Sequence, residues 1–317
     1  MTGVQLHVDT DVGGDPDDAC ALAMLLSWPG IEIVGVTTNL DDGGTRAACA
    51  AYLLAVAGHR AIPVVAGAEC SLTTGERFAS TYGDARCWPP SIAPAPAPHG
   101  RALARPQQSI GAGATIVAIG AFTNFARLEQ VRPGSLRNAR IVAMAGWLEA
   151  PPPDLPQWGA EMDFNAQCDT QATEIVAAAA GDLTLVTLPA AMHAQLRTRD
   201  LPRLRAAGEV GALLARQSEV RAHDGDIATL ARAHARLPDD LVNFHWDPVT
   251  AAVAAGWDGA AVERRVLTCT VTDGVARFVD DPKGRPVTVV TAVDAAAFAE
   301  LFLARIEALA AQSPASP

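Results

Sequence analysis

A short acidic turn near the N-terminus carries the residues best suited to do chemistry. Residues 9–18 read Asp-Thr-Asp-Val-Gly-Gly-Asp-Pro-Asp-Asp, so five carboxylates lie within ten residues. Brought together away from water, such carboxylates would repel one another by several kcal/mol. A hard divalent cation, Ca²⁺ or Mg²⁺, offsets this repulsion because both ions prefer oxygen ligands. The turn therefore predicts a metal or substrate site, and the alternative is a solvated turn that caps a helix.

Three further polar segments lie where apolar runs end or helical runs begin. They are residues 120–124 (Gly-Ala-Phe-Thr-Asn), 161–169 (Glu-Met-Asp-Phe-Asn-Ala-Gln-Cys-Asp) and 244–248 (Phe-His-Trp-Asp-Pro). Each is a weak signal alone, since an Asp before a helix is often only its cap. In open α/β sheets, however, ligands bind at the carboxyl ends of the strands. Their shared position therefore favours one common site.

The elements that would position these segments alternate between short apolar runs and alanine-rich helical runs. Strands are predicted at 4–8, 31–38, 61–66, 115–120, 140–146 and 183–188, and helices at 17–27, 46–57 and 170–180. The alternation is typical of βαβ units and predicts a doubly wound, Rossmann-like α/β fold, with a mostly parallel open sheet flanked by helices. Two proline-rich stretches, 77–108 and 150–160, are predicted to be loops. Residues 1–311 are expected to form a single domain, followed by a frayed tail at 312–317.

Composition limits the classes of function. The 317 residues are 50% hydrophobic, and 24 Lys and Arg against 35 Asp and Glu give a net charge of −11. This acidity argues against binding to nucleic acid or to an anionic membrane. We find no run of about 18 apolar residues and no signal peptide, and expect a cytoplasmic protein. The six cysteines form no CxxC pair and are expected to be reduced.

Taken in order, the four segments resemble the motifs of the inosine-uridine-preferring nucleoside hydrolases. The family's DxDxGxDD turn is similar to residues 9–13 followed by Asp17-Asp18, with two residues inserted around Asp15-Pro16. Its GPLTN-like turn resembles residues 120–124. Its ExN segment resembles Asp163-Phe164-Asn165, with Asp for Glu, and its HDP signature resembles Trp246-Asp247-Pro248. The resemblance covers nearly the whole chain. It implies the nucleoside hydrolase fold and hydrolysis of the N-glycosidic bond of a ribonucleoside, or a related N-riboside, to free base and ribose.

The resemblance also implies a Ca²⁺ ion. Its ligands would be the carboxylates of Asp11, Asp18 and Asp247 and the backbone carbonyl of Thr123, with Asp9 as a supporting neighbour. In the family the ion binds a water molecule and the 2′,3′-diol of the ribose. The cation lowers the pKa of its water, and a carboxylate removes the proton before attack on the anomeric carbon. Asp11 is our candidate for this general base.

The same resemblance assigns the sugar contacts by position. Asp17 and Asn165 would bind the diol, and Asp163 would bind the 5′-hydroxyl. Another diol contact falls on either Asn39 or Asp42, and the sequence leaves both open. Such contacts raise the rate where they strengthen as the sugar develops oxocarbenium-like charge.

The leaving-group side departs most from the family. Trp246 stands where the signature has His, and a Trp side chain stacks on a base but does not protonate it. His245, one residue earlier, is our candidate acid, and the alternatives are another residue or no general acid at all. Trp147, Trp158 and Trp246 are candidates for a base pocket, although tryptophans also serve simply as core.

Two other classes of function stay open on the sequence. A haloacid-dehalogenase-type Mg²⁺ phosphatase also has a DxD pair after its first strand, but it expects Thr or Val where this chain has Gly13. A non-catalytic nucleoside-binding paralogue would keep the acidic turn and lose efficient cleavage. The expected partner is a small-molecule nucleoside, and the resemblance implies a homodimer or homotetramer.

Overall fold

The computed structural model describes residues 3–78, 84–89, 92–93, 95–97 and 99–312, and a nine-stranded sheet forms its centre. In sheet order the strands are β10 (Val275–Asp280), β9 (Ala260–Thr272), β11 (Arg285–Val293), β6 (Asp182–Val186), β5 (Arg140–Met144), β4 (Thr115–Ile119), β1 (Val4–Thr10), β2 (Ile31–Thr38) and β3 (Val64–Val65). The strands from β11 to β3 run parallel, and β9 and β10 add an antiparallel end. The predicted mostly parallel open sheet is confirmed.

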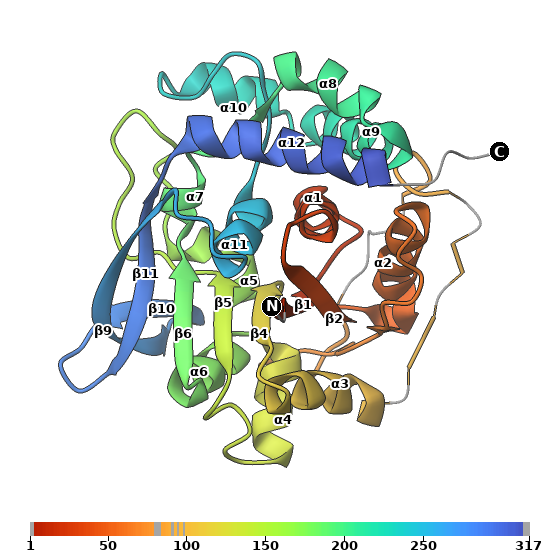
Figure 1. The fold of residues 1–317 in the computed structure, drawn as a ribbon. Coiled ribbons are helices and arrows are strands. Elements are labelled where there is room, and N and C mark those ends of the chain that lie inside the picture. The colour runs from red at the N-terminus through yellow and green to blue at the C-terminus, as the bar shows by residue number, and fades with distance from the viewer. Residues whose placement is uncertain (1–2, 79–83, 90–91, 94, 98, 313–317) are drawn as a thin grey trace.

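Helices cover both faces of this sheet (Figure 1). One face carries α3 (His99–Gly111), α4 (Thr123–Val131) and α6 (Thr170–Ala179), and the other carries α1 (Asp17–Leu26), α2 (Thr45–Val56), α11 (Trp246–Ala254) and α12 (Ala295–Gln312). In β4, Ile116 and Ala118 belong to the hydrophobic core on the face that carries α3, α4 and α6. Val117 and Ile119 belong to the core on the opposite face. Successive side chains of a strand point to opposite faces, so a strand covered on both sides is apolar throughout.

The remaining elements lie around these two layers. The helices are α5 (Phe164–Gln167), α7 (Leu188–Ala191), α8 (Leu201–Ala206), α9 (Gly208–Asp224) and α10 (Ile227–Ala233), with short 3₁₀ turns η1 (Asp42–Gly44), η2 (Ala160–Met162) and η3 (Thr198–Asp200). Strands β7 (Gln195–Arg197) and β8 (Leu241–Phe244) form a separate antiparallel pair. No helix in the described part of the chain is long and apolar enough to span a membrane.

Most predicted elements are confirmed, and two need correction. The strand predicted at 61–66 pairs with β2 only at Val64–Val65, and Pro63 before it has no N–H to donate to a ladder. The loop predicted at 77–108 is wrong from His99 onward, where α3 begins. This helix contains Pro106, but the alanines, leucine and glutamines around it favour the helical state.

The other predicted boundaries stand close to the observed ones. The loop predicted at 150–160 is irregular up to Gly159, and η2 begins at Ala160. The described cysteines are all free thiols, as expected. Gln312 ends α12, while 313–317, the rest of the predicted frayed tail, lies outside the described residues.

Candidate active site and metal centre

Three buried carboxylates meet where two helices begin. Asp17 and Asp18 open α1, Asp247 lies in the first turn of α11, and the two helices pack against each other. One carboxylate oxygen from each of the three residues lies within 4.8 Å of the others, and the residues are only 4–6% exposed. The positive end of each helix dipole favours negative charge there. The folding of the chain thus brings together the first and last of the four sequence segments.

The protein alone does not offset the burial of these carboxylates or the repulsion among them. Burial raises the pKa of Asp17, Asp18 and Asp247 well above the usual range, and repulsion from neighbouring aspartates raises it further. A cation bound among them would restore the ionised forms. The donor set consists of oxygens, which fits a hard divalent ion such as Ca²⁺ or Mg²⁺. The residues present therefore fit a metal, and within the described chain they form the one such group of three acidic, His or Cys ligands.

Asp11 lies beside this group and not within it. Its backbone N–H donates to Oδ1 of Asp18 at 3.1 Å, and its Oδ2 lies 3.6 Å from Nη2 of Arg46. Burial raises the pKa of the Asp11 carboxyl, and the Arg46 guanidinium opposes that rise. Arg46 is itself buried and donates to the carbonyls of Val12 (3.2 Å) and Leu40 (3.1 Å). No sequence pattern indicates this role, because an Arg at the start of an alanine-rich helix is usually exposed.

Asp9 lies one layer deeper, in a network that joins three strand ends. Its carboxylate accepts hydrogen bonds from Nδ2 of Asn39 (2.6 Å), from Nδ2 of Asn124 (2.7 Å) and from the hydroxyl of Thr37. Burial raises its pKa to about 7 despite these donors. A Cβ on Gly120 would lie 2.6 Å from the Asn39 amide, so this close approach requires glycine.

The two candidates for the additional diol contact are both engaged elsewhere. Asn39 donates to Asp9, and its Oδ1 accepts the N–H of Ala121 at 3.0 Å. Asp42 is partly exposed in η1 and pairs with Arg77. Asn39 therefore serves the strand-end network, and Asp42 belongs to a surface ion pair.

The segment after β5 supplies the remaining sugar candidates. Asp163 caps α5 by accepting the N–H of Ala166 (3.2 Å) and also accepts the N–H of Gly146 (2.6 Å), and burial raises its pKa to about 6. Nδ2 of Asn165 donates to the carbonyl of Met144 at 3.0 Å. Asp163 and Asn165 are thus both fixed to the carboxyl end of β5, the edge of the sheet that also carries the acidic turn after β1.

Thr123, whose carbonyl the resemblance implies as a metal ligand, is the first residue of α4 after β4. It is fully buried, and its hydroxyl donates to Oδ2 of Asp169 at 2.8 Å. Asp169 also caps α6, so the position of Thr123 is set by a contact between two helices.

His245, the candidate acid, lies in the core beside α12. Its ring is buried against Phe302 and Phe298 of α12, with centroids 4.4 and 5.5 Å away, and burial lowers its pKa to about 3. A neutral imidazole in this core is not an acid for a departing base. Consecutive residues before a helix point in different directions, so the side chain one position from the family's His enters the core.

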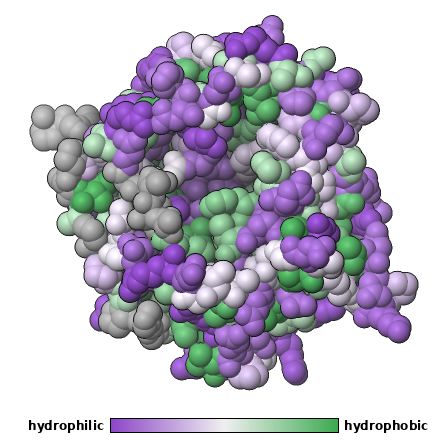
Figure 2. Space-filling view, turned by 180° about the vertical axis from the view of Figure 1, so that it is seen from behind, coloured by the Kyte–Doolittle hydropathy of each residue, from purple (hydrophilic) through white to green (hydrophobic). Residues whose placement is uncertain are grey.

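Trp246 belongs to a separate aromatic group. Its ring lies 4.6 Å from that of Phe244, and Trp158 from the 150–160 loop meets Phe244 edge-on at 6.3 Å. Trp158 and Trp246 are only partly buried, so both keep some exposed aromatic surface, and Trp246 directly precedes Asp247 in the chain. Figure 2 shows a hollow on the face behind that of Figure 1, with hydrophilic residues at its back and hydrophobic residues beside them.

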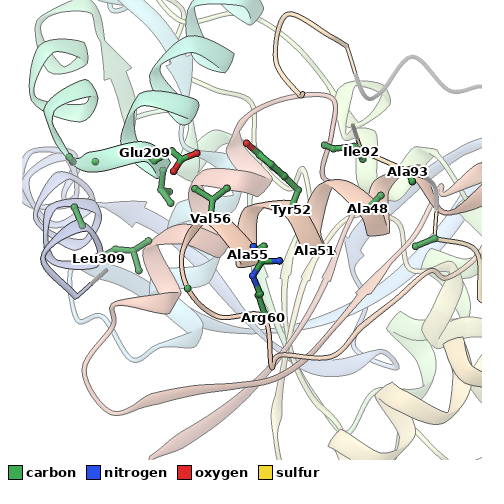
Figure 3. A pocket seen from close by; sticks show the side chains of 16 residues that line it. Ala48, Ala51, Tyr52, Ala55, Val56, Arg60, Ile92, Ala93, Glu209 and Leu309 are labelled. Atoms are coloured by element: carbon green, nitrogen blue, oxygen red, sulfur yellow. The ribbon is translucent and has the colours of Figure 1, made fainter. Parts of the chain in front are cut away.

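A cavity of about 850 Å³ lies elsewhere, between α2, the start of α9 and the end of α12 (Figure 3). Its lining includes Tyr52, Val56, Arg60, Glu209 and Leu309, and it includes no residue of the carboxylate group. The candidate site is therefore defined by the carboxylates and not by this cavity.

Comparison with known proteins places the chain. The family model of inosine-uridine preferring nucleoside hydrolases matches residues 6–300. The pyrimidine-specific ribonucleoside hydrolase RihA of Salmonella enteritidis PT4 is 26% identical over 297 residues, which are 90% of this chain and 87% of that protein. RihA of Citrobacter koseri is 30% identical over 209 residues, 63% of this chain and 65% of that one.

Solved structures show the same fold. A plant nucleoside hydrolase, PpNRh1, matches with a TM-score of 0.77 at 22% identity, over 96% of this chain and 99% of that one. A purine-preferring ribonucleoside hydrolase from Gardnerella vaginalis matches with a TM-score of 0.76 at 19% identity, over 98% and 100%. The family model, which spans nearly the entire chain, identifies it as a member of the inosine-uridine preferring nucleoside hydrolase family, a hydrolase of the N-glycosidase type.

Proposed function

We propose that the chain hydrolyses ribonucleosides to free base and ribose with Ca²⁺ held at the group of Asp17, Asp18 and Asp247. The observation that carries the proposal is the convergence of three buried carboxylates within 4.8 Å at two helix N-termini. The phosphatase alternative does not account for the position of Asp247 beside Asp17 and Asp18. Membership of the family removes that alternative.

Asp18 and Asp247 are the proposed carboxylate ligands, with the Thr123 carbonyl as a further oxygen. Asp17 is close enough to them to serve both the ion and the diol. When bound, the ion supplies positive charge that lowers the pKa of a water and holds the sugar hydroxyls. Asn165 and Asp163 bind the sugar from the end of β5, where their backbone contacts fix them.

Asp11 is the proposed general base. It lies beside Asp18 and is the carboxylate of the turn with a buried guanidinium close by. Arg46 favours the ionised form of Asp11, which is the form able to take a proton from the attacking water. Its attachment to Val12 and Leu40 keeps the guanidinium in place.

In this proposal the nucleobase, the leaving group of the reaction, lies against aromatic side chains. Trp246 and Trp158 offer ring faces for stacking, and no histidine acid is assigned, because His245 lies in the core. Relatives are named pyrimidine-specific and a structural neighbour purine-preferring, so the first substrate panel contains both kinds of base. A binding paralogue is the second candidate, favoured by the same lack of an assigned acid.

A reducing-sugar assay tests the proposal. Purine and pyrimidine ribonucleosides are incubated with the chain, with a chelator, and with Ca²⁺ or Mg²⁺ added back. Ribose that disappears with the chelator and returns with Ca²⁺ supports the proposal. Saturable binding of nucleosides without release of ribose would instead identify a binding paralogue.

A further inference from the structure

Asp15, one of the residues inserted into the acidic turn, makes two side-chain contacts with elements outside the turn. Its Oδ1 accepts a hydrogen bond from Nδ2 of Asn243 in β8 at 2.7 Å, and its Oδ2 accepts one from Nε of Arg221 in α9 at 2.7 Å. The Asn243 side chain is buried, and the Asp15 carboxylate is 27% exposed. The two partners lie more than 200 residues away in sequence.

These contacts connect the two halves of the carboxylate group. Asp15 lies two residues before Asp17, and Asn243 lies four residues before Asp247. Between Asn243 and Asp247 the chain passes only from the end of β8 into the first turn of α11. A single hydrogen bond between side chains therefore joins the turn that carries Asp17 and Asp18 to the segment that carries Asp247.

We infer that Asp15 is a positioning residue that holds these two segments together against the repulsion of their carboxylates, a role that rests on the proposed function. Asp15 touches neither the reacting atoms nor the ion in this role and acts through Asp17 and Asp247. Arg221 contributes a positive charge that offsets the fourth carboxylate at this place. Asn243 adds no charge, and its hydrogen bond orients the Asp15 carboxylate.

The other contacts of the turn hold a different part of it. Arg46 of α2 donates to the carbonyl of Val12, and the indole N–H of Trp88 donates to the carbonyl of Gly13 at 3.3 Å. Both contacts fix the beginning of the turn. Among the described hydrogen bonds of residues 11–18, only the Asn243 contact reaches the strand that leads to Asp247.

Calcium affinity of the full chain, measured by isothermal titration calorimetry, is the direct test. Asn243→Ala removes the bridge without changing charge, and we expect the Kd for Ca²⁺ to rise about tenfold or more, because a hydrogen bond to a charged group is lost. At saturating Ca²⁺ its kcat should stay within about threefold of the parent's, since no group that touches the substrate is removed.

A charge-swapped pair separates positioning from general damage. Asn243→Asp places two carboxylates face to face and should weaken Ca²⁺ binding more than Asn243→Ala does. Combining it with Asp15→Asn restores one donor and one acceptor, and the double variant should recover most of the lost affinity. Glu307→Gln, which breaks the Arg203–Glu307 pair between α8 and α12, is the control and should leave the Kd unchanged.

Distinct outcomes overturn the inference and the proposed function. A Kd for Ca²⁺ within twofold of the parent's in both Asn243 variants overturns the inference, as does a double variant no better than Asn243→Asp. An equal loss of affinity in Glu307→Gln also overturns it, because the effect would then follow from stability. A parent that binds Ca²⁺ but releases no ribose overturns the proposed function and leaves the role of Asp15 standing.

Discussion

Replacing Asp247 by Asn should make the metal-free protein more stable and the calcium-loaded protein less so. The substitution keeps the shape of the side chain and removes one of three buried negative charges within 4.8 Å of one another. The raised pKa values of Asp17, Asp18 and Asp247 show that the native state opposes their simultaneous ionisation. Loss of one charge relieves this opposition only while no cation is bound.

The magnitude follows from the distances. At 4.8 Å and an effective dielectric constant of about 20, one pair of carboxylates repels by about 3.5 kcal/mol, and Asp247 takes part in two such pairs. Partial protonation already relieves much of this repulsion, so we expect a net gain of about 2 kcal/mol at pH 7.5. For a chain of this length that gain corresponds to a rise of about 3 °C in Tm.

Calcium should reverse the order. At 1,000 times its Kd, a ligand that binds only the native state stabilises the parent by about 4.1 kcal/mol. The variant should lose most of this gain, which is more than the roughly 2 kcal/mol that it gains without metal. Thermal unfolding of both proteins in chelator and in Ca²⁺ checks the reversal, and Asp294→Asn is the control. Asp294 accepts the N–H of Ala297 at the start of α12, and Asn is an equally good cap, so neither condition should change its Tm. A variant less stable than the parent in chelator, or one with an undiminished calcium response, would refute the reasoning.

Four further changes test other parts of the site. Asp11→Asn should lower kcat at least a hundredfold while Ca²⁺ binding persists, and turnover within a few-fold of the parent's would remove Asp11 as the base. Arg46→Met should destabilise the chain by about 3 kcal/mol in urea unfolding and move the acidic limb of the pH–rate profile to higher pH, because it leaves Asp11 buried without its guanidinium. Asp163 has a folded pKa of about 6 against 3.8, so the native state binds its proton more tightly, and its contribution to stability falls by about 2 kcal/mol from pH 4 to 7; urea midpoints of Asp163→Asn should show a smaller fall. Trp246→Ala should change the ratio of kcat/KM between purine and pyrimidine nucleosides, and an unchanged ratio would exclude Trp246 from the base pocket.

The oligomeric state stays a prediction of the resemblance. Light scattering coupled to gel filtration distinguishes a monomer from the expected homodimer or homotetramer.

Local sequence patterns were sufficient for the core elements. Apolar runs such as 115–120 predict buried strands because both faces of a central strand need apolar side chains. The same patterns did not predict the antiparallel end of the sheet formed by β9, β10 and β11. They also did not predict α3, because the segment before it is rich in proline and predicts a loop.

The sequence by itself determined the acidic turn, the order of the four segments and hence the family, because these features depend on residue type and short spacing. Only the tertiary structure decided which carboxylates meet, since Asp247 reaches Asp17 and Asp18 by the packing of α11 against α1. It also decided that His245 enters the core, that Asn39 serves Asp9, and that Arg46 and Asp15 brace the turn. The direction of a side chain and its burial depend on elements distant in sequence, and no local pattern records them.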